Sequence, residues 1–438
     1  MESAIYEMIC RRAEALEDKL TAYRRDFHTY AESGWNEYRT SAVVARSLQD
    51  LGYEVLMGRD VCRADARMGL PTDETMEREY RRAREQGADP ARTAAMRGGF
   101  TGVIGILDCG EGPTIAMRFD IDALGVYESN APEHRPAREG FRSVNEGVMH
   151  ACGHDGHTAI GLGVAEVLMG LRQQLRGKIK LIFQPAEEGV RGAAAIVAAG
   201  HLDDVDYVIG NHMGNGTGDG QIGLTWRATL ATTKLDVTFR GRAAHAAMVP
   251  EQGSNAMLAA ATAVLNLHAI PRCSTGDTRI NVGTLRAGSG RNVICDRAVL
   301  EMEVRGATTE TNDFVEQYAR RIVESAAAMH GCTCEIRRMG AAESLQSHPD
   351  FVRYAQRVLT EKLGLRIPPV SEKAGASEDF AAMVNRVQSH GGKGLAFTTF
   401  APCSGPFHGK NFDFPETVLP NAVKAFCGLT CSLMEEPF

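Results

Sequence analysis

The sequence has no Cys-x-x-Cys pair, although it contains 11 cysteines among its 438 residues. Paired cysteine spacings are typical of structural zinc modules, and a disulfide scaffold is shorter and denser in cysteine. Neither class of protein fits this chain. We therefore expect a cytoplasmic protein with reduced thiols, most of which serve as small residues of the core.

The chain also lacks long hydrophobic runs and an excess of positive charge. No stretch approaches the ~18 consecutive apolar residues of a membrane span, and the N-terminus lacks the apolar core of a signal peptide. Its 48 Lys and Arg against 55 Asp and Glu give a net charge of −7, which provides no electrostatic argument for nucleic acid. We expect neither a membrane nor a nucleic acid as partner.

From residue 100 onward the sequence alternates between short apolar runs and helical patterns. Runs at 101–107, 114–120, 178–183, 207–210 and 395–400 are bounded by Gly, Pro and Asp and predict strands. Helical patterns at 158–171 and 192–199 lie between them. This alternation predicts an α/β catalytic domain with a mixed sheet covered on both faces.

Residues 229–340 have a different order of elements. Runs at 234–241, 254–269, 279–285, 299–304, 312–330 and 332–338 give the order β-α-β-β-α-β, which is typical of a ferredoxin-like α+β domain. We therefore predict a lid and dimerisation domain at 229–340, inserted into a catalytic domain formed by 1–228 and 341–438. The polar stretch at about 59–97 predicts a helical insertion, with a solvated helix at 74–87.

The densest chemical cluster is His150-Ala-Cys-Gly-His-Asp-Gly-His157. Cysteine and histidine at such close spacing favour metal ligation, which would involve Cys152 and His154. The alternative is a set of capping and core hydrogen bonds before the next helix. That alternative suits Asp155 and His157, but it does not explain the whole cluster.

Two adjacent carboxylates, Glu187 and Glu188, follow a predicted buried strand. Adjacent carboxylates repel unless solvent separates them or a cation draws them together, so one could bind a metal while the other acts as general base. His212 and His408 also follow predicted strands, and each alone is explained by ordinary hydrogen bonding. Together these residues lie where open α/β sheets place their sites. His245, in the predicted lid, would be a turn histidine if considered alone.

Several segments resemble the dinuclear metallo-amidohydrolases related to aminoacylase and carboxypeptidase G, in the branch that contains hippurate hydrolase and the plant auxin-conjugate hydrolases. The segments are 150–157, Gln184-Pro-Ala-Glu-Glu-Gly189, Arg118-Phe-Asp-Ile-Asp-Ala-Leu124, 24–28 with Glu32, His245, 292–294 and 374–380. They occur in the family's order across essentially the whole chain. Segments 31–35, 67–71 and 289–293 are most similar to members that hydrolyse p-aminobenzoyl-glutamate. Cys295 stands where the family usually has proline, which we expect to affect a turn.

The resemblance implies two divalent metal ions per subunit, zinc or manganese. The implied ligands are Cys152, His154, Glu188, His212 and His408. It also implies Glu187 as general base and Asp120 as a supporting residue near the metals. His245 and Asn292 would reach the scissile amide from the lid, and in relatives this histidine comes from the partner subunit of a dimer.

The implied reaction is hydrolysis of an N-acyl amino acid, most closely p-aminobenzoyl-glutamate, to p-aminobenzoate and glutamate. The substrate carboxylates need cationic partners, and Arg291 and Arg305 of the lid are candidates that surface ion pairs would equally explain. An aminoacylase or hippurate-like hydrolase is an alternative function. A non-catalytic partner subunit is another, although the intact Glu187–Glu188 pair argues against it. A homodimer through the lid and an assembly with a related second subunit both fit the sequence.

Overall fold

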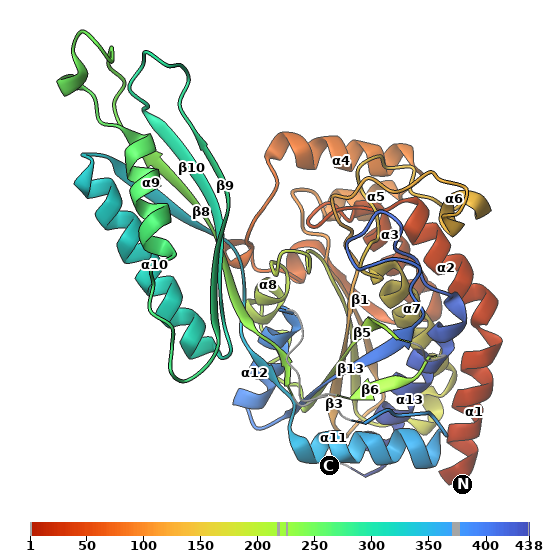
Figure 1. The fold of residues 1–438 in the computed structure, drawn as a ribbon. Coiled ribbons are helices and arrows are strands. Elements are labelled where there is room, and N and C mark those ends of the chain that lie inside the picture. The colour runs from red at the N-terminus through yellow and green to blue at the C-terminus, as the bar shows by residue number, and fades with distance from the viewer. Residues whose placement is uncertain (1, 217–219, 225–226, 370–376, 437) are drawn as a thin grey trace.

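The computed structural model describes residues 2–216, 220–224, 227–369, 377–436 and 438. Figure 1 shows a large α/β body and a smaller body that projects from it. The matched segment at 374–380 therefore lies partly outside the described residues. All 11 cysteines are free, as expected from their spacing. Among the helices described, none has the length and apolar character needed to span a bilayer.

A seven-stranded mixed sheet forms the centre of the large body, as predicted. Its strand order is β1-β2-β4-β3-β5-β13-β6, and the four neighbours β4, β3, β5 and β13 run parallel. The edge pairs β1–β2 and β13–β6 and the pair β2–β4 are antiparallel. The bounds are β1 Glu54–Met57, β2 Val103–Asp108, β3 Thr114–Asp120, β4 Lys178–Gln184, β5 Tyr207–Asn215, β6 Ile222–Leu224 and β13 Lys393–Ala401.

Helices cover both faces of this sheet, which explains why its strands are apolar throughout. Along β3, Ile115, Met117 and Phe119 face one hydrophobic core and Ala116 faces another, as the two-residue period of a strand requires. The helices on the side of the first core are α1 Glu2–Ala15, α2 Glu17–Thr29, α3 Tyr38–Leu51, α7 His154–Gly170, α11 Pro349–Arg357 and α13 Leu419–Glu435. On the other side lie α8 Ala193–Ala198 and α12 Phe380–Ser389.

The insertion contains α4 Asp73–Glu85 and α5 Pro90–Ala95, and a short helix α6 Arg135–Glu139 follows later in the chain. The predicted solvated helix is present as α4, and one of its faces is packed against the body. Met76, Tyr80 and Ala83 are buried, because their three- and four-residue spacing forms an apolar stripe. The ring of Tyr80 packs edge-on against that of Tyr38 in α3.

The smaller body contains the predicted β-α-β-β-α-β order. Its elements are β8 Ala231–Arg240, α9 Ala256–Leu267, β9 Thr278–Ala287, β10 Arg297–Gly306, α10 Thr309–Met329 and β11 Thr333–Ala342. The strands form one antiparallel sheet in the order β11-β8-β10-β9. Both helices cover one face over a separate core, and the opposite face points toward the large body (Figure 1). The short strands β7 Arg227–Thr229 and β12 Leu345–Gln346 pair where the chain passes between the bodies.

Candidate metal centre

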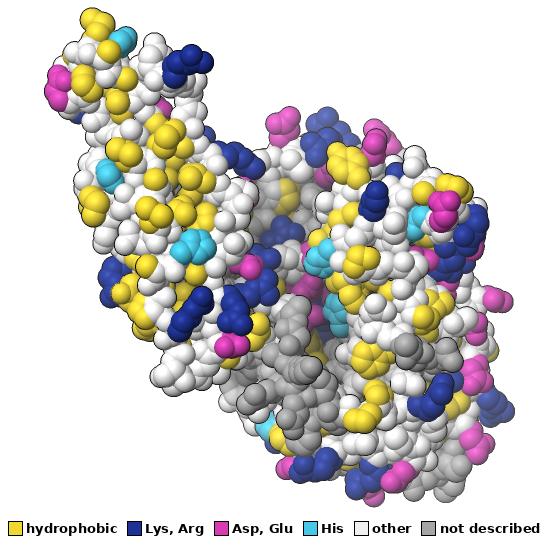
Figure 2. Space-filling model, in the orientation of Figure 1, with side chains coloured by type: hydrophobic (Ala, Val, Ile, Leu, Met, Phe, Trp, Pro, Cys, Tyr) yellow, Lys and Arg dark blue, Asp and Glu magenta, His cyan; other side chains and the backbone are white. Residues whose placement is uncertain are grey.

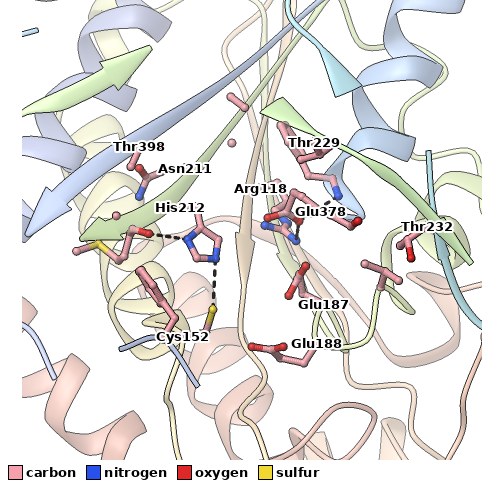
Figure 3. A pocket seen from close by; sticks show the side chains of 18 of the residues that line it. Arg118, Cys152, Glu187, Glu188, Asn211, His212, Thr229, Thr232, Glu378 and Thr398 are labelled. Carbon is pink, nitrogen blue, oxygen red and sulfur yellow. Dashed lines mark hydrogen bonds and ion pairs between the residues drawn. The ribbon is translucent and has the colours of Figure 1, made fainter. Parts of the chain in front are cut away.

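Chemically active side chains gather at the carboxyl ends of the parallel strands. Asp120 ends β3, Glu187 and Glu188 follow β4, and His212 lies near the end of β5. Figure 3 shows Cys152, His212, Glu187 and Glu188 around one pocket. The sheet order therefore assembles groups that lie far apart in the sequence, as open α/β sheets generally do at this edge.

The start of α7 places the histidines of the densest sequence cluster. The helix begins at His154 and not near residue 158 as expected, because Gly153 adopts the left-handed conformation (φ 90°) that turns the chain into it. The ring of His154 hydrogen-bonds through Nδ1 to the backbone carbonyl of Asp122 at 2.9 Å. That bond leaves Nε2 directed into the cluster with its lone pair available.

The other two histidines near His154 have different environments. His157 accepts a hydrogen bond from the backbone amide of Met213 through Nε2 at 2.8 Å and contacts Asp120 through Nδ1. Both of its ring nitrogens are therefore occupied, so His157 orients Asp120. His212 donates from Nδ1 to the carbonyl of Met213 at 2.7 Å, and its Nε2 lies 3.6 Å from Cys152 Sγ. His212 therefore directs its Nε2 toward Cys152.

The candidate donors lie at distances from one another that a shared cation would bridge. His154 Nε2 is 3.9 Å from an oxygen of Glu187 and 3.9 Å from Glu188 Oε1, and His408 Nε2 is 3.7 Å from the same Glu188 oxygen. Cys152, Glu188 and His408 form one group with metal-ligand spacing, and Cys152, His154 and His212 form another. His154 Nε2 and Glu188 Oε1 are buried without a hydrogen-bond partner. Buried polar atoms without partners are rare, so the donor set fits bound divalent metal.

Burial and mutual repulsion dominate the electrostatics of the two glutamates. Burial raises the pKa of Glu187 well above its ordinary value, and the nearby carboxylates of Glu378 and Glu188 raise it further. Burial also raises the pKa of Glu188 to about 7 against the opposing effect of His154. The thiol of Cys152 has a raised pKa because it is buried. A divalent cation would reverse these shifts for its ligands, since it stabilises carboxylate and thiolate.

Two residues that flank the cluster have an unusual backbone. Ala186 (φ 52°) and His408 (φ 62°) adopt the left-handed conformation, which is sparsely populated for residues with a Cβ. The backbone amide of His408 donates to the carbonyl of Ala151 at 2.8 Å, which fixes the C-terminal loop to the segment that carries Cys152. The strained backbone therefore places His408 beside donors that lie far earlier in the chain.

A cavity of about 530 Å³ opens over this cluster, between the two bodies. Figure 2 shows the hollow, with acidic and histidine side chains at its depth. Its walls include Cys152, Glu187, Glu188, His212 and His408 from the large body, and Thr232, Lys234 and Arg305 from the small body. The cavity is large enough for a small-molecule substrate.

The structure separates three predicted site residues from this cavity. His245, Arg291 and Asn292 are exposed in the loops after β8 and before β10, at the far tip of the small body. His245 forms an isolated bridge with Val293, and its Nδ1 accepts the backbone amide of Met248 at 3.1 Å. Because the long strands β8 and β10 lead away from the large body, these loops lie outside the cavity of their own chain. Arg305, the other predicted substrate-binding residue, does line it.

Three residues that shape the site were not among those predicted from the sequence. Arg118 is buried and forms ion pairs with Asp120 at 2.6 Å and Glu378 at 2.8 Å. Asp122 holds His154 and the segment of the two glutamates, and Lys234 lines the cavity. A charged residue inside an apolar strand, as Arg118 is in β3, was a signal that the sequence offered. The position of Lys234 had no comparable signal.

Comparison with known proteins adds a family match and similar relatives. The model of peptidase family M20/M25/M40 matches residues 116–431. The indole-3-acetyl-aspartic acid hydrolase of Enterobacter agglomerans is 48% identical over 93% of this chain and 94% of its own length. One of the subunits of the p-aminobenzoyl-glutamate hydrolase of Escherichia coli K12 is 47% identical over 95% of this chain and 96% of its own length.

Solved structures agree with this match. An aminobenzoyl-glutamate utilization protein from Klebsiella pneumoniae superposes with a TM-score of 0.83 and 41% identity, covering 97% of this chain and 98% of its own. The YXEP protein of Bacillus subtilis, described as a dinuclear metal-binding peptidase of the M20 family, has a TM-score of 0.66 and 26% identity over 96% of this chain and 99% of its own.

Proposed function

Because the chain belongs to peptidase family M20/M25/M40 and is a metal-dependent amidohydrolase, we propose that it hydrolyses p-aminobenzoyl-glutamate to p-aminobenzoate and glutamate. The observation that carries this proposal is the complete donor cluster in a cavity of substrate size, in a chain 47% identical to a hydrolase named for that substrate. A non-catalytic partner subunit would have no need for buried donors without partners.

The proposed metal ligands are those implied by the sequence: Cys152, His154, Glu188, His212 and His408. Their support is the two overlapping donor groups and the two buried atoms that lack hydrogen-bond partners. A thiolate favours zinc, whereas imidazole and carboxylate also accept manganese. When bound, two such ions would lower the pKa of a water molecule and polarise the amide carbonyl.

Glu187 is the proposed general base. It lies beside the donor cluster and its burial raises its pKa, so it can take a proton from water and then deliver it to the leaving amine. Asp120 is a positioning residue, because Arg118 and His157 both contact its carboxylate. These contacts fix the charge beside His154, whose Nε2 lies 3.7 Å from Asp120.

His245 and Asn292 complete the proposed site from a second chain. In their own chain they lie at the distal tip, so a role in catalysis requires a second chain, and we propose a homodimer formed through the small body. Support comes from the helix α9, where Met257, Leu258 and Leu265 are exposed, and from β9, which is the edge strand of its sheet. An assembly with a related second chain is the alternative, since one relative is named as a subunit.

The test is turnover by the purified chain after loading with zinc or manganese. We expect hydrolysis of p-aminobenzoyl-glutamate, loss of activity on chelation and recovery when metal is restored. Indole-3-acetyl-aspartate is the comparison substrate, because a relative of equal similarity is named for it. Hippurate represents the hippurate-like alternative. A higher kcat/KM for either comparison substrate would overturn the proposed specificity, and inactivity of the metal-loaded chain on all three would favour the non-catalytic alternative.

A further inference from the structure

Two cations of the small body face the cavity side by side. Lys234 lies on β8 and Arg305 on β10, and the register of the two strands pairs Lys234 with Glu303 and Arg305 with Thr232. Residues two apart on a strand share a face, so all four side chains lie on the face opposite helices α9 and α10. Lys234, Thr232 and Arg305 line the cavity, and Figure 3 labels Thr232 on this wall.

The charge of Arg305 is already balanced within the small body. Its guanidinium forms two parallel hydrogen bonds with the carboxylate of Glu303, at 3.0 and 3.1 Å. Its remaining Nη1 reaches the hydroxyl of Ser377 at 3.4 Å, across the cavity wall. Arg305 is thus held in a fixed orientation with one edge toward the cavity.

Lys234 differs because its charge has no such counterpart. The residue is half-buried, and among the described residues its ammonium forms no ion pair or hydrogen bond. It lines the same cavity as His408 and Glu188 of the donor cluster. Of the cations that line the cavity, Arg118 is neutralised by Asp120 and Glu378. Among the described cations that line the cavity, Lys234 is therefore the one without a counter-charge.

A substrate that fills the cavity displaces water from this ammonium. If the substrate places a neutral side chain beside the Lys234 ammonium, the ammonium is desolvated without a partner, which is costly. A substrate carboxylate at the same place would form a charge-assisted pair with it. Every N-acyl amino acid carries one α-carboxylate, for which Arg305 provides an oriented donor. A second, unpaired cation matches a second carboxylate.

We infer that Lys234 selects amides whose leaving amino acid carries a side-chain carboxylate, such as glutamate or aspartate. This inference rests on the proposed function, because it specifies the amino acid accepted at the same site. It accounts for one feature common to the two relatives named above, whose names contain aspartic acid and glutamate despite different acyl groups.

The experiment compares p-aminobenzoyl-glutamate with p-aminobenzoyl-glutamine, which has the same shape without the charge. We expect the holoenzyme to prefer glutamate and Lys234→Met to lower the ratio of the two kcat/KM values by roughly 10- to 100-fold. Lys234→Arg should retain most of the preference. The matched control is Arg337→Met, because Arg337 lies opposite Asp236 on the same face of the sheet, outside the cavity lining.

An unchanged ratio in Lys234→Met would overturn the inference, and an equal loss for both substrates, which leaves the ratio unchanged, would assign Lys234 to the α-carboxylate. The same comparison with indole-3-acetyl-aspartate and indole-3-acetyl-asparagine separates this inference from the proposed substrate. If only the indole pair is hydrolysed, the proposed substrate fails, and the ratio still tests Lys234. If neither pair is hydrolysed, affinities of the two p-aminobenzoyl compounds measured by calorimetry give the ratio, and equal affinities would overturn the inference.

Discussion

The carboxylate of Asp122 accepts the backbone amide of Glu188 at 2.9 Å. The other oxygen of this carboxylate accepts a hydrogen bond from the amide of Glu187 at 3.1 Å. The backbone carbonyl of Asp122 accepts a hydrogen bond from Nδ1 of His154 at 2.9 Å. Asp122, which lies in the segment after β3, thus fixes both the loop after β4 and the first turn of α7. The proposed metal site depends on this residue, although Asp122 is not among the proposed ligands.

Asp122→Ala should therefore lower metal affinity by roughly 10- to 100-fold, the usual effect of removing a group that orients a metal ligand. Competition with a chelator measures this affinity directly. Asp206→Ala is a suitable control, because Asp206 accepts a backbone amide from Thr114 away from the cluster. An unchanged affinity in Asp122→Ala would mean that its neighbours hold the loop without it.

Cys152→Ser should reduce metal occupancy, because the hydroxyl of serine does not ionise readily and the thiolate is lost. Elemental analysis after dialysis checks this expectation. Cys62, which is buried away from the cavity, provides the matched Cys→Ser control. Full occupancy in Cys152→Ser would identify Cys152 as a structural thiol.

Glu187→Gln should lower kcat by at least about 10²-fold, since it removes the general base while keeping the shape of the side chain. Metal content should stay intact, because Glu187 is not among the proposed ligands. Elemental analysis and turnover on the same sample separate these two effects. Activity near that of the unmodified enzyme would reject Glu187 as the base.

Mixing two inactive variants tests whether His245 acts across a dimer. His245→Ala and Glu187→Gln should each be inactive alone, yet a mixed dimer contains one cavity with an intact Glu187 and an intact histidine from the other chain. Co-expression or exchange of chains should restore a measurable fraction of the activity. His268→Ala, an exposed histidine after α9, controls for general effects on the small body. Mixed dimers without activity would show that His245 does not serve the other chain.

Acid stability should depend on Glu128. Burial alone would raise its pKa, but hydrogen bonds with His134 and His28, both at 2.9 Å, overcome this effect and lower the pKa from 4.5 to about 2. A lowered carboxylate pKa stabilises the folded state above pH 4.5, and this contribution disappears as the pH falls from 4.5 to 2. Glu128→Gln should cost about 3 kcal/mol of unfolding free energy at pH 7.

Denaturant unfolding at pH 7 and pH 2.5 measures this difference. The gap between Glu128→Gln and the unmodified chain should narrow at the lower pH. Glu14→Gln, which affects only the pair of Glu14 with Lys424 at the surface, should change stability little at either pH. A gap of the same size at both pH values would contradict the assignment.

The α/β body and the family were predictable from the sequence, and both predictions are confirmed. Alternating strands and helices arise from local patterns, and the Cys-His cluster is dense enough to identify by itself. The start of α7 was not predictable, since Gly153 and His154 give no apolar periodicity. The roles of Asp122 and Lys234 depend on which strand lies beside which, and on the face that each residue of β8 occupies. Such relationships between distant segments have no local sequence pattern.

The placement of β13 has a consequence for the making of the protein. This strand comes from near the end of the chain, yet it lies between β5 and β6 in the sheet. His408 follows it, so the ribosome has synthesised four of the five proposed ligands long before it reaches the fifth. A nascent chain that has not yet reached His408 lacks one of the five proposed ligands, whatever metal is present in the cell. The proposed centre therefore gains its fifth ligand only when translation is nearly complete, and a chain terminated before His408 would offer four of the five proposed ligands.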